Sequence, residues 1–452
     1  MSFANQRNVL IHDRLGNLYN FQWHKEKVIY THFDKYLKEY TSDVFVDDCT
    51  LEYDAVIDEE NIVYFGYQRK DGKLVLMSLE NGFWHENILG GDHTLNILNL
   101  NLFIYKQKVH MIYCIPANES DMCYRIYHHY YNDQEWKTFV VQDIKRKNLL
   151  NSFQIIKNEE ILMLGFYDFL KDQEQIYIKE FDLEKEQWKN SIEITSSSKE
   201  KLYLDMFVEK NRILHVAYSE YVEGNLVIKY EKYKFENNQI KKLIEKILSN
   251  PSNCSYATFV KQNEKLWVIW TEYEQVVSCF TEDNGKTWSE PYLWKESKTI
   301  DFFRYKFNTN AQEIKAGYEL NYTFGKGYPE FSFIGFGFLE NVDQIPLKIG
   351  SNKKLEDMTR KKKVNHKETK AKEIKTKEKE IKRENIFGKE LHVLQKQIKL
   401  LEEKIDEKFK RIEALGNQIE TIEEKLKRFD EVEETVKHMD EYLKRKRRGF
   451  FR

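Results

Sequence analysis

Two adjacent histidines followed closely by an aspartate are the nearest approach of this sequence to a set of metal ligands. His128, His129 and Asp133 would supply imidazole and carboxylate donors of the kind that bind zinc. Adjacent residues on a strand point to opposite faces, so we predict one core and one surface histidine here and no metal site. The sequence has neither a glycine-rich phosphate loop nor a Gly-x-Ser-x-Gly turn. We therefore expect neither a metal nor a cofactor.

The stretch TEDNGKTW, from Thr281 to Trp288, combines residues that suit a tight turn between two strands. Asp283 can accept hydrogen bonds from turn amides, and Gly285 can adopt a positive φ. Trp288 can bury a large ring beside the turn. We interpret this stretch as architecture rather than as a catalytic motif.

The elements around this turn are predicted to be short strands. From about residue 8 to residue 338, runs rich in Val, Ile, Tyr, Phe and Trp alternate with polar turns, as in NIVYFGY, RILHVAYSEY and KLWVIWTEY. Similar turn-then-strand contexts recur at intervals of about 50 residues, which indicates a repeat architecture. The residues that mark them are Trp84, Trp136, Trp188, Ile240 and Trp288.

A second marker of the repeat is an apolar strand that ends in an aromatic residue. It occurs at Tyr67, Tyr113, Phe166, Tyr218, Trp270 and Tyr318. About 50 residues per unit fit four short antiparallel strands, which form one blade of a β-propeller. We predict a mainly β fold with six blades, the last built from both ends of the region, or seven if the first 35 residues form their own blade. We expect the six aromatic residues to pack between blades, with a sugar-binding surface as the alternative.

The turn motif resembles the Asp-box of the sialidase and BNR-repeat families. That pattern is Ser or Thr, any residue, Asp, any, Gly, any, Thr, Trp, and it is matched by Thr281, Asp283, Gly285, Thr287 and Trp288. The resemblance implies a β-propeller in which the box joins the outer two strands of a blade, away from the ligand funnel. The other copies of the motif are degenerate.

The enzymes of the resembled families hold a substrate carboxylate with three arginines, attack with a tyrosine paired to a glutamate, and use an aspartate as acid and base. Arginine is scarce before Pro346, and no Arg-Ile-Pro-like segment precedes the box. Tyr and Glu are so frequent that a Tyr–Glu pair can be drawn almost anywhere. We therefore assign no catalytic residue. Arg304, in an expected inner strand, is the one predicted funnel residue.

The chain after the strand-rich region changes character twice. Residues 346–385 are dominated by Lys and Glu and cannot form a core, so we predict a charged linker. Residues 386–443 carry apolar residues at heptad spacing, which predicts a long α-helical coiled coil, in parallel dimers because Ile prevails at a and Leu at d. A single amphipathic helix folded back on the first region is the alternative. The predicted core positions are Leu391, Leu394, Ile398, Leu401, Ile405, Ile412, Leu415, Ile419, Ile422, Leu426 and Phe429.

The last residues, 444–452, read KRKRRGFFR. Clustered cations attract anionic surfaces, and two Phe rings add apolar anchoring. A basic cap on a helix C-terminus is the alternative, because positive charge is favourable there. An anionic membrane or a nucleic acid is the partner that this tail would contact.

Composition limits the remaining classes of protein. The net charge of -2 divides into about -12 before Pro346 and about +10 from there on. The cysteines Cys49, Cys114, Cys123, Cys254 and Cys279 form no CxxC pair and are expected to be reduced thiols. No secretory leader or long apolar segment is apparent, so we expect a cytoplasmic protein. Residue usage is typical of an AT-rich bacterial genome.

These features together predict a non-catalytic, oligomeric binding or scaffold protein. Residues 1–345 would form an Asp-box-type propeller that recognises a glycan or a protein, and the coiled coil would gather several copies and raise avidity. A sialidase-like glycoside hydrolase and a structural coat or assembly protein are the alternatives.

Overall fold

The strand-rich region forms β-strands joined by tight turns, with very little helix. The computed structural model describes residues 2–348, apart from 90–95, 118–121, 132–134, 147–152, 159, 171–172, 223, 237–238 and 328–329. In the described part the helical segments are the 3₁₀ turn η1 (Lys295–Lys298) and the helix α1 (Gln312–Gly317). The prediction of a mainly β fold is confirmed.

Three of the sheets are four-stranded antiparallel meanders. Their strands are β5 (Tyr53–Ile57), β6 (Val63–Gln68), β7 (Leu74–Glu80) and β8 (Phe83–Leu89); β9 (Leu98–Tyr105), β10 (Lys108–Pro116), β11 (Cys123–Tyr131) and β12 (Trp136–Lys145); and β18 (Lys201–Val208), β19 (Ile213–Val222), β20 (Asn225–Glu236) and β21 (Gln239–Ile247).

Two further sheets are meanders with additional short strands. One contains β13 (Phe153–Lys157), β14 (Leu162–Leu170), β15 (Gln173–Asp182), β16 (Gln187–Trp188) and β17 (Ile192–Glu193). The other contains β22 (Ser255–Gln262), β23 (Lys265–Glu272), β24 (Gln275–Thr281) and β25 (Tyr292–Trp294), extended by β27 (Tyr318–Leu320) beside β22 and by β30 (Val342–Gln344) beside β25.

The remaining sheet joins the two ends of the region. It contains β1 (Ser2–His12), β2 (Leu18–His24), β3 (Lys27–Asp34) and β4 (Glu39–Val46), followed on the other side of β1 by β26 (Phe302–Thr309), β28 (Tyr322–Lys326) and β29 (Ser332–Ile334). Strands β1 and β26 pair in parallel, with Leu10 opposite Phe307. The two ends share one sheet as predicted, although the N-terminal segment supplies four strands rather than the outer half of a blade.

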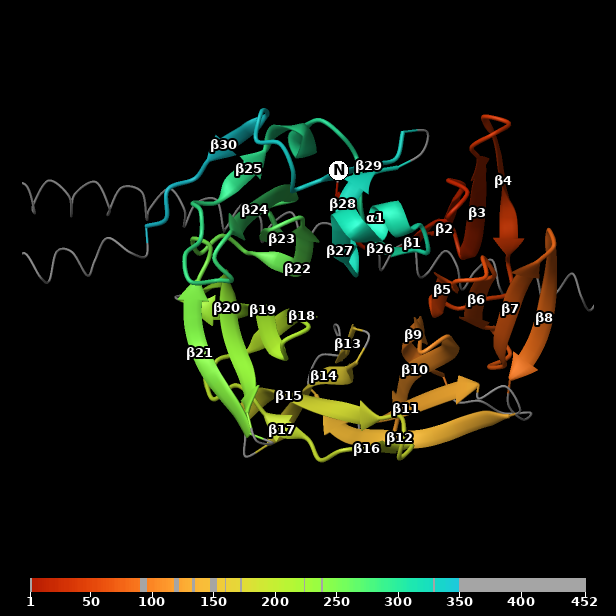
Figure 1. The fold of residues 1–452 in the computed structure, drawn as a ribbon, viewed down its shortest axis with the longest axis horizontal. Helices are drawn as coiled ribbons and strands as arrows, with labels where there is room; N and C mark the ends of the chain where they lie inside the picture. The colour runs from red at the N-terminus through yellow and green to blue at the C-terminus, as the bar shows by residue number, and fades with distance from the viewer. Residues whose placement is uncertain are drawn as a thin grey trace, which may run out of the picture. The chain divides into compact units, whose positions relative to one another are not determined.

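The six sheets of the described residues follow one another in a closed ring. Strand β1 contacts β5, β5 contacts β9, β12 contacts β14, β13 contacts β18, β18 contacts β22, and β22 contacts β28 of the first sheet again. Figure 1 shows the sheets around a common centre, with β5, β9, β13, β18 and β22 on the inside. A ring of antiparallel sheets with their first strands at the centre is a β-propeller-like architecture.

The hydrophobic core is divided in the same way. Six clusters of buried apolar residues each lie between two neighbouring sheets in the described part of the chain. Between the sheets of β9–β12 and β13–β17, for example, Ile112 and Tyr130 pack with Leu164 and Phe166. Each of these clusters combines residues of two sheets, so each sheet depends on both neighbours for burial of its apolar faces.

The repeat seen in the sequence maps onto the sheets. Trp84, Trp136, Trp188 and Ile240 lie on β8, β12, β16 and β21, and Trp288 precedes β25. One interval of about 50 residues therefore corresponds to one sheet, with the marker in or near its fourth strand.

Candidate functional site

Five inner strands each carry a buried polar side chain at an equivalent position. The five side chains are Asp54 on β5, Asn101 on β9, Gln154 on β13, Asp205 on β18 and Thr258 on β22. The carboxylate of Asp54 accepts a hydrogen bond from the amide of Leu102 on the next inner strand at 2.6 Å. Asp54, Gln154, Asp205 and Thr258 form hydrogen bonds between neighbouring sheets, whereas Asn101 bonds to Asn99 of its own strand. The spacing of the five residues follows the repeat.

Asp205 is the most fully bonded of these residues. Its Oδ1 accepts a hydrogen bond from Nε2 of Gln154 at 2.7 Å. Its Oδ2 accepts from the Thr258 hydroxyl at 3.1 Å and from the Phe259 amide at 2.7 Å. Burial raises the pKa of Asp205, while the hydrogen bonds from Gln154 and Phe259 oppose that rise. Both oxygens are occupied, so this carboxylate holds three strands together rather than offering a free acid.

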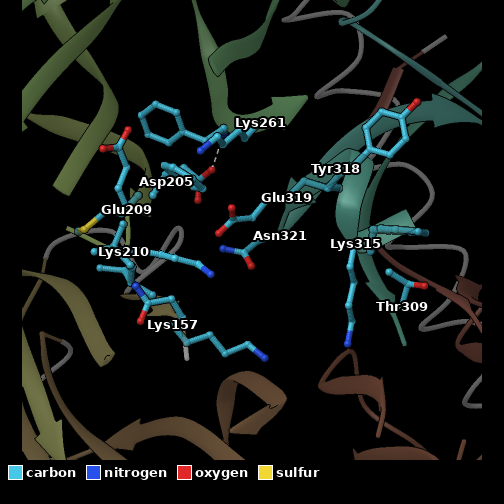
Figure 2. A pocket seen from close by; sticks show the side chains of 18 of the residues that line it. Lys157, Asp205, Glu209, Lys210, Lys261, Thr309, Lys315, Tyr318, Glu319 and Asn321 are labelled. Atoms are coloured by element: carbon cyan, nitrogen blue, oxygen red, sulfur yellow. Dashed lines mark hydrogen bonds between the residues drawn. The ribbon is translucent and has the colours of Figure 1, made fainter. Parts of the chain in front are cut away.

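A cavity of about 750 Å³ opens beside this ring, at the C-terminal ends of the inner strands β13, β18, β22 and β26. Figure 2 shows side chains from these strands and from the segment around β27 pointing into the space. Five asparagines line it: Asn158, Asn211, Asn284, Asn308 and Asn321. A primary amide offers two donors and an acceptor with two lone pairs, so the wall is rich in neutral hydrogen-bonding groups.

Charged side chains of both signs also line the cavity. They are Lys157, Lys210, Lys261, Lys315, Asp205, Glu209, Glu264 and Glu319. Glu319 points into the space beside Asn321 (Figure 2). Enclosure in the cavity raises the pKa of Glu319, while the charges of Lys261 and Lys210 act in the opposite direction. Glu209 lies 3.3 Å from Nε2 of His215.

The predicted Asp-box forms the turn between β24 and β25. Oδ1 of Asp283 accepts from the Thr287 amide at 2.8 Å, and Oδ2 accepts from the Thr287 hydroxyl at 2.7 Å. Thr281 Oγ1 donates to Asp283 Oδ1 at 2.9 Å and accepts from the Gly285 amide at 2.9 Å. These bonds, led by the one from the Thr287 amide, lower the pKa of Asp283 to about 2.

The same turn meets the neighbouring sheet and the cavity. Gly285 has a φ of +80°, and Trp288 packs edge-on against Tyr230 with ring centroids 4.8 Å apart. Asn284, inside the box, lines the cavity. The cavity therefore opens on the side of the molecule that carries this turn.

Arg304 lies on β26 and is not among the residues that line the cavity of about 750 Å³. Its guanidinium stacks on the ring of Tyr322 at 3.9 Å and lies 5.6 Å from the centroid of Tyr256. Its role as a funnel residue stays a prediction.

The six strand-end aromatic residues divide into two groups. Tyr67, Tyr113, Phe166, Tyr218 and Trp270 are buried in the clusters between sheets, as predicted. Tyr318 is 37% exposed and lines the cavity. It belongs to β27, a short strand that pairs with β22 in addition to the four-stranded meander. Tyr318 therefore does not occupy the position that the repeat pattern predicts.

The histidine pair behaves as predicted from strand alternation. His128 is fully buried, whereas His129 on the other face of β11 contacts the hydroxyls of Thr138 and Tyr113, each at 2.9 Å. Within the described ranges no group of three His, Cys, Asp or Glu side chains is placed to hold a metal ion. No helix in that part of the chain is long and apolar enough to cross a membrane.

The predicted coiled coil, the basic aromatic tail and all of the linker after residue 348 lie outside the described residues. Sequence reasoning did not single out Lys157, Asp205, Glu319 or Asn321. A signal existed for Asp205, because polar residues interrupt the apolar inner strands with the period of the turn motif. No comparable signal marks Lys157, Glu319 or Asn321, since cavity walls are formed by segments distant in sequence.

Comparisons with known proteins give structural neighbours only. No protein-family model matches the chain. No curated protein matches it either.

Among solved structures, the polysaccharide lyase Uly1 matches 60% of this chain and 78% of its own, with a TM-score of 0.43 and 10% identity. The Aleuria aurantia lectin AAL matches 63% of this chain and 94% of its own, with a TM-score of 0.37 and 9% identity. A Trypanosoma rangeli sialidase matches 46% of this chain and 39% of its own, with a TM-score of 0.31 and 11% identity. Structural similarity at these TM-scores and sequence identities supports no inference about the function of this chain.

Proposed function

We propose that this chain is a non-catalytic binding protein whose propeller takes a glycan in the cavity at the ends of its inner strands. The observation that supports this most is the set of five asparagines lining a space of about 750 Å³. Pockets that bind drug-sized molecules have volumes of roughly 300 to 1,000 Å³, and their walls are mostly apolar. An amide-rich wall of that size suits a ligand covered with hydroxyl groups, because each amide can both donate and accept.

The arrangement of the carboxyl groups favours binding over hydrolysis. Glycoside hydrolysis ordinarily uses two free carboxyl groups, one acid and one nucleophile or base. Asp205 has both oxygens bonded to protein groups, and Glu209 lies 3.3 Å from Nε2 of His215. The other two acids that line the cavity are Glu319 and Glu264, and Glu264 is exposed in the turn between β22 and β23. A sialidase-like hydrolase is the alternative function.

The assembly belongs to the same proposal. We count the seven-stranded sheet as one composite blade, which makes a six-bladed propeller; the seven-bladed alternative counts β26, β28 and β29 separately. The heptads of residues 386–443 would then join copies through a parallel coiled coil and raise avidity for a repeated ligand. A membrane or nucleic-acid contact of the tail and a cytoplasmic location stay predictions.

Asn321 offers a direct test of the glycan proposal. Its side chain points into the cavity (Figure 2), and replacing it with alanine removes cavity hydrogen bonds without removing a charge. We expect Asn321→Ala to weaken binding of a glycan found on an array screen by about threefold to tenfold, the worth of one or two neutral hydrogen bonds. Isothermal titration calorimetry of the full chain measures the change.

Asn87→Ala is the matched control, because Asn87 is exposed on the outer strand β8. It should leave the affinity unchanged. Equal affinity of the Asn321→Ala and unsubstituted proteins would place the glycan elsewhere. No glycan binding at all would favour a scaffold role, and release of sugar from a fluorogenic glycoside would favour the hydrolase alternative.

A further inference from the structure

Lys157 occupies a point where three cavities adjoin. It is the last residue of β13 and lines the main cavity, a second one of about 360 Å³ and a narrow one of about 30 Å³. The narrow cavity shares Asn308 and Asn321 with the main one and extends to Lys306 and Tyr322. Lys157 is therefore at the inner end of the main cavity.

The ammonium group of Lys157 has a backbone partner but forms no ion pair with a carboxylate of the described residues. Its Nζ donates to the carbonyl of Ile104 at 2.6 Å and lies 5.9 Å from the centroid of the Phe103 ring. An ammonium has three donors, and a carbonyl compensates its charge only weakly. Among the described residues, no carboxylate lies in ion-pair contact with this cation.

The neighbouring lysines differ from Lys157 in this respect. Lys306 forms an ion pair with Asp54 and donates to the carbonyl of Leu102 at 2.8 Å. Lys315 forms an ion pair with Glu59 at 2.5 Å. Their acids are thus already engaged, and Lys157 is the lysine at this inner end that retains donors for a ligand.

The electrostatic surroundings of Lys157 favour an added negative charge. Burial lowers the pKa of Lys157 to about 8, the positive charges of Lys306 and Lys315 act in the same direction, and the charge of Glu59 opposes them. An anion in the cavity would stabilise the charged form of the ammonium and so oppose the lowering of its pKa. Of the acids that line the main cavity, Asp205 is hydrogen-bonded to neighbouring strands. Glu319 points into the space beside Asn321, and burial raises its pKa, which favours its neutral form, while the charges of Lys261 and Lys210 oppose that rise.

We propose that the inner end of the cavity is an oxyanion site, in which Lys157 holds a phosphate, sulfate or carboxylate group of the ligand and Asn321 donates beside it. This inference rests on the proposed use of the cavity for ligand binding and narrows the ligand to an acidic one. A cation that faces a cavity with free donors forms charge-assisted hydrogen bonds, which are roughly twice as strong as neutral ones.

Titration of the full chain with inorganic phosphate and with glucuronate tests the site, and glucose serves as the uncharged sugar. Lys157→Met removes the charge while keeping much of the side-chain volume, and Lys157→Arg keeps the charge. The matched control is Lys179→Met. Lys179 is also a lysine whose Nζ donates to a backbone carbonyl at 2.6 Å, that of Val141, but it does not line these three cavities.

We expect saturable binding of phosphate or glucuronate by the unsubstituted protein, and at least about a tenfold loss in Lys157→Met, the loss of one charged hydrogen bond. Lys157→Arg should stay within about threefold of the unsubstituted protein, and Lys179→Met should equal it. Preference for phosphate over glucuronate would identify a free or esterified phosphate, and the reverse a sugar carboxylate.

The outcomes separate the two proposals. No saturable binding of either anion, or equal binding by Lys157→Met, would overturn the oxyanion site. Glucose binding that survives Lys157→Met unchanged, with no anion binding, would retain the glycan proposal and reject this one. Phosphate binding that depends on Lys157, with no binding of any sugar, would retain the oxyanion site and reject the glycan proposal.

Discussion

At the scale of single residues, His110 and His128 form a buried pair that fixes their protonation. His110 Nε2 lies 3.2 Å from the carbonyl oxygen of Tyr105, so Nε2 carries the proton. His110 Nδ1 lies 2.9 Å from His128 Nε2 and must then accept from it. Nδ1 of His128 has no partner among the described residues. A second proton on His110 would place two N–H groups against each other unless the proton of His128 moved to Nδ1, where no acceptor lies among the described residues.

This pair predicts a loss of stability in mild acid. Burial lowers the pKa of His110 to about 3 and that of His128 well below its ordinary value. The unfolded chain therefore binds more protons than the folded one below a pH of about 6.5, and stability falls as the pH drops, by about 1.4 kcal/mol per pH unit for each histidine. Urea unfolding of the full chain between pH 7 and pH 5 measures this slope.

The double variant His110→Phe with His128→Phe is the control for that slope. Removing both partners together leaves no single buried donor unpaired. Its unfolding free energy should depend less steeply on pH over the same range. An unchanged slope would assign the effect to the other histidines whose pKa values burial lowers: His12, His32, His129 and His215.

At the scale of elements, the β24–β25 turn depends on the glycine at its centre. A Cβ added at Gly285 would lie 2.0 Å from the hydroxyl oxygen of Tyr230, and the φ of +80° is strained for any other residue. Tyr230 is fully buried, and Nδ1 of His215 lies 2.8 Å from its hydroxyl oxygen, so it cannot easily move. The turn and the neighbouring sheet are packed as one unit.

Gly285→Ala and Gly224→Ala separate backbone strain from this contact. Gly224 also has a φ of +80°, but a Cβ there would meet nothing within 4 Å. We expect Gly224→Ala to cost about 1 to 2 kcal/mol from backbone strain alone. Gly285→Ala should cost a further 1 to 3 kcal/mol, roughly, from overpacking against Tyr230. Equal losses in thermal or urea unfolding would show that Tyr230 moves aside.

At the scale of the whole molecule, the ring is closed by the pairing of β1 with β26. The apolar residues Val9 and Ile11 of β1 belong to the same cluster as Tyr53 and Phe65 of the next sheet. Because each core lies between two sheets, opening the ring at any point would expose the apolar faces on both sides. The pairing of β1 with β26 therefore helps to keep the apolar faces of the sheets buried throughout the ring.

The predicted coiled coil implies that truncation changes assembly. A chain ending before residue 386 should remain folded, because the six sheets of the described residues all lie before residue 349. It should be monomeric, whereas we expect the full chain to form a dimer through the heptads of residues 386–443. Light scattering after size-exclusion chromatography measures both masses. A truncated chain that aggregates or stays dimeric would contradict the two-part organisation.

Much of the fold could be predicted because strand physics is local. Alternating runs such as KLWVIWTEY define strands, and the tryptophans near the fourth strands define the sheet interval. The pairing of the two ends of the region could be predicted because an unpaired strand edge would otherwise be exposed. The parallel register of β1 on β26 could not be predicted, because it depends on how the last strands reach the centre of the ring.

The sequence by itself determined the strand pattern, the repeat and the turn chemistry of Asp283 and Gly285, since hydrogen bonds and dihedral preferences within a turn involve neighbours in the chain. Only the tertiary structure decided which side chains share a cavity. Lys157, Asn284 and Asn321 lie far apart in sequence and line one space. Lys157 ends the inner strand β13, Asn284 lies in the turn between β24 and β25, and Asn321 follows β27. The tertiary structure likewise decided that Lys157 has no carboxylate partner among the described residues, because Asp54 and Glu59 are engaged by lysines from the opposite end of the region.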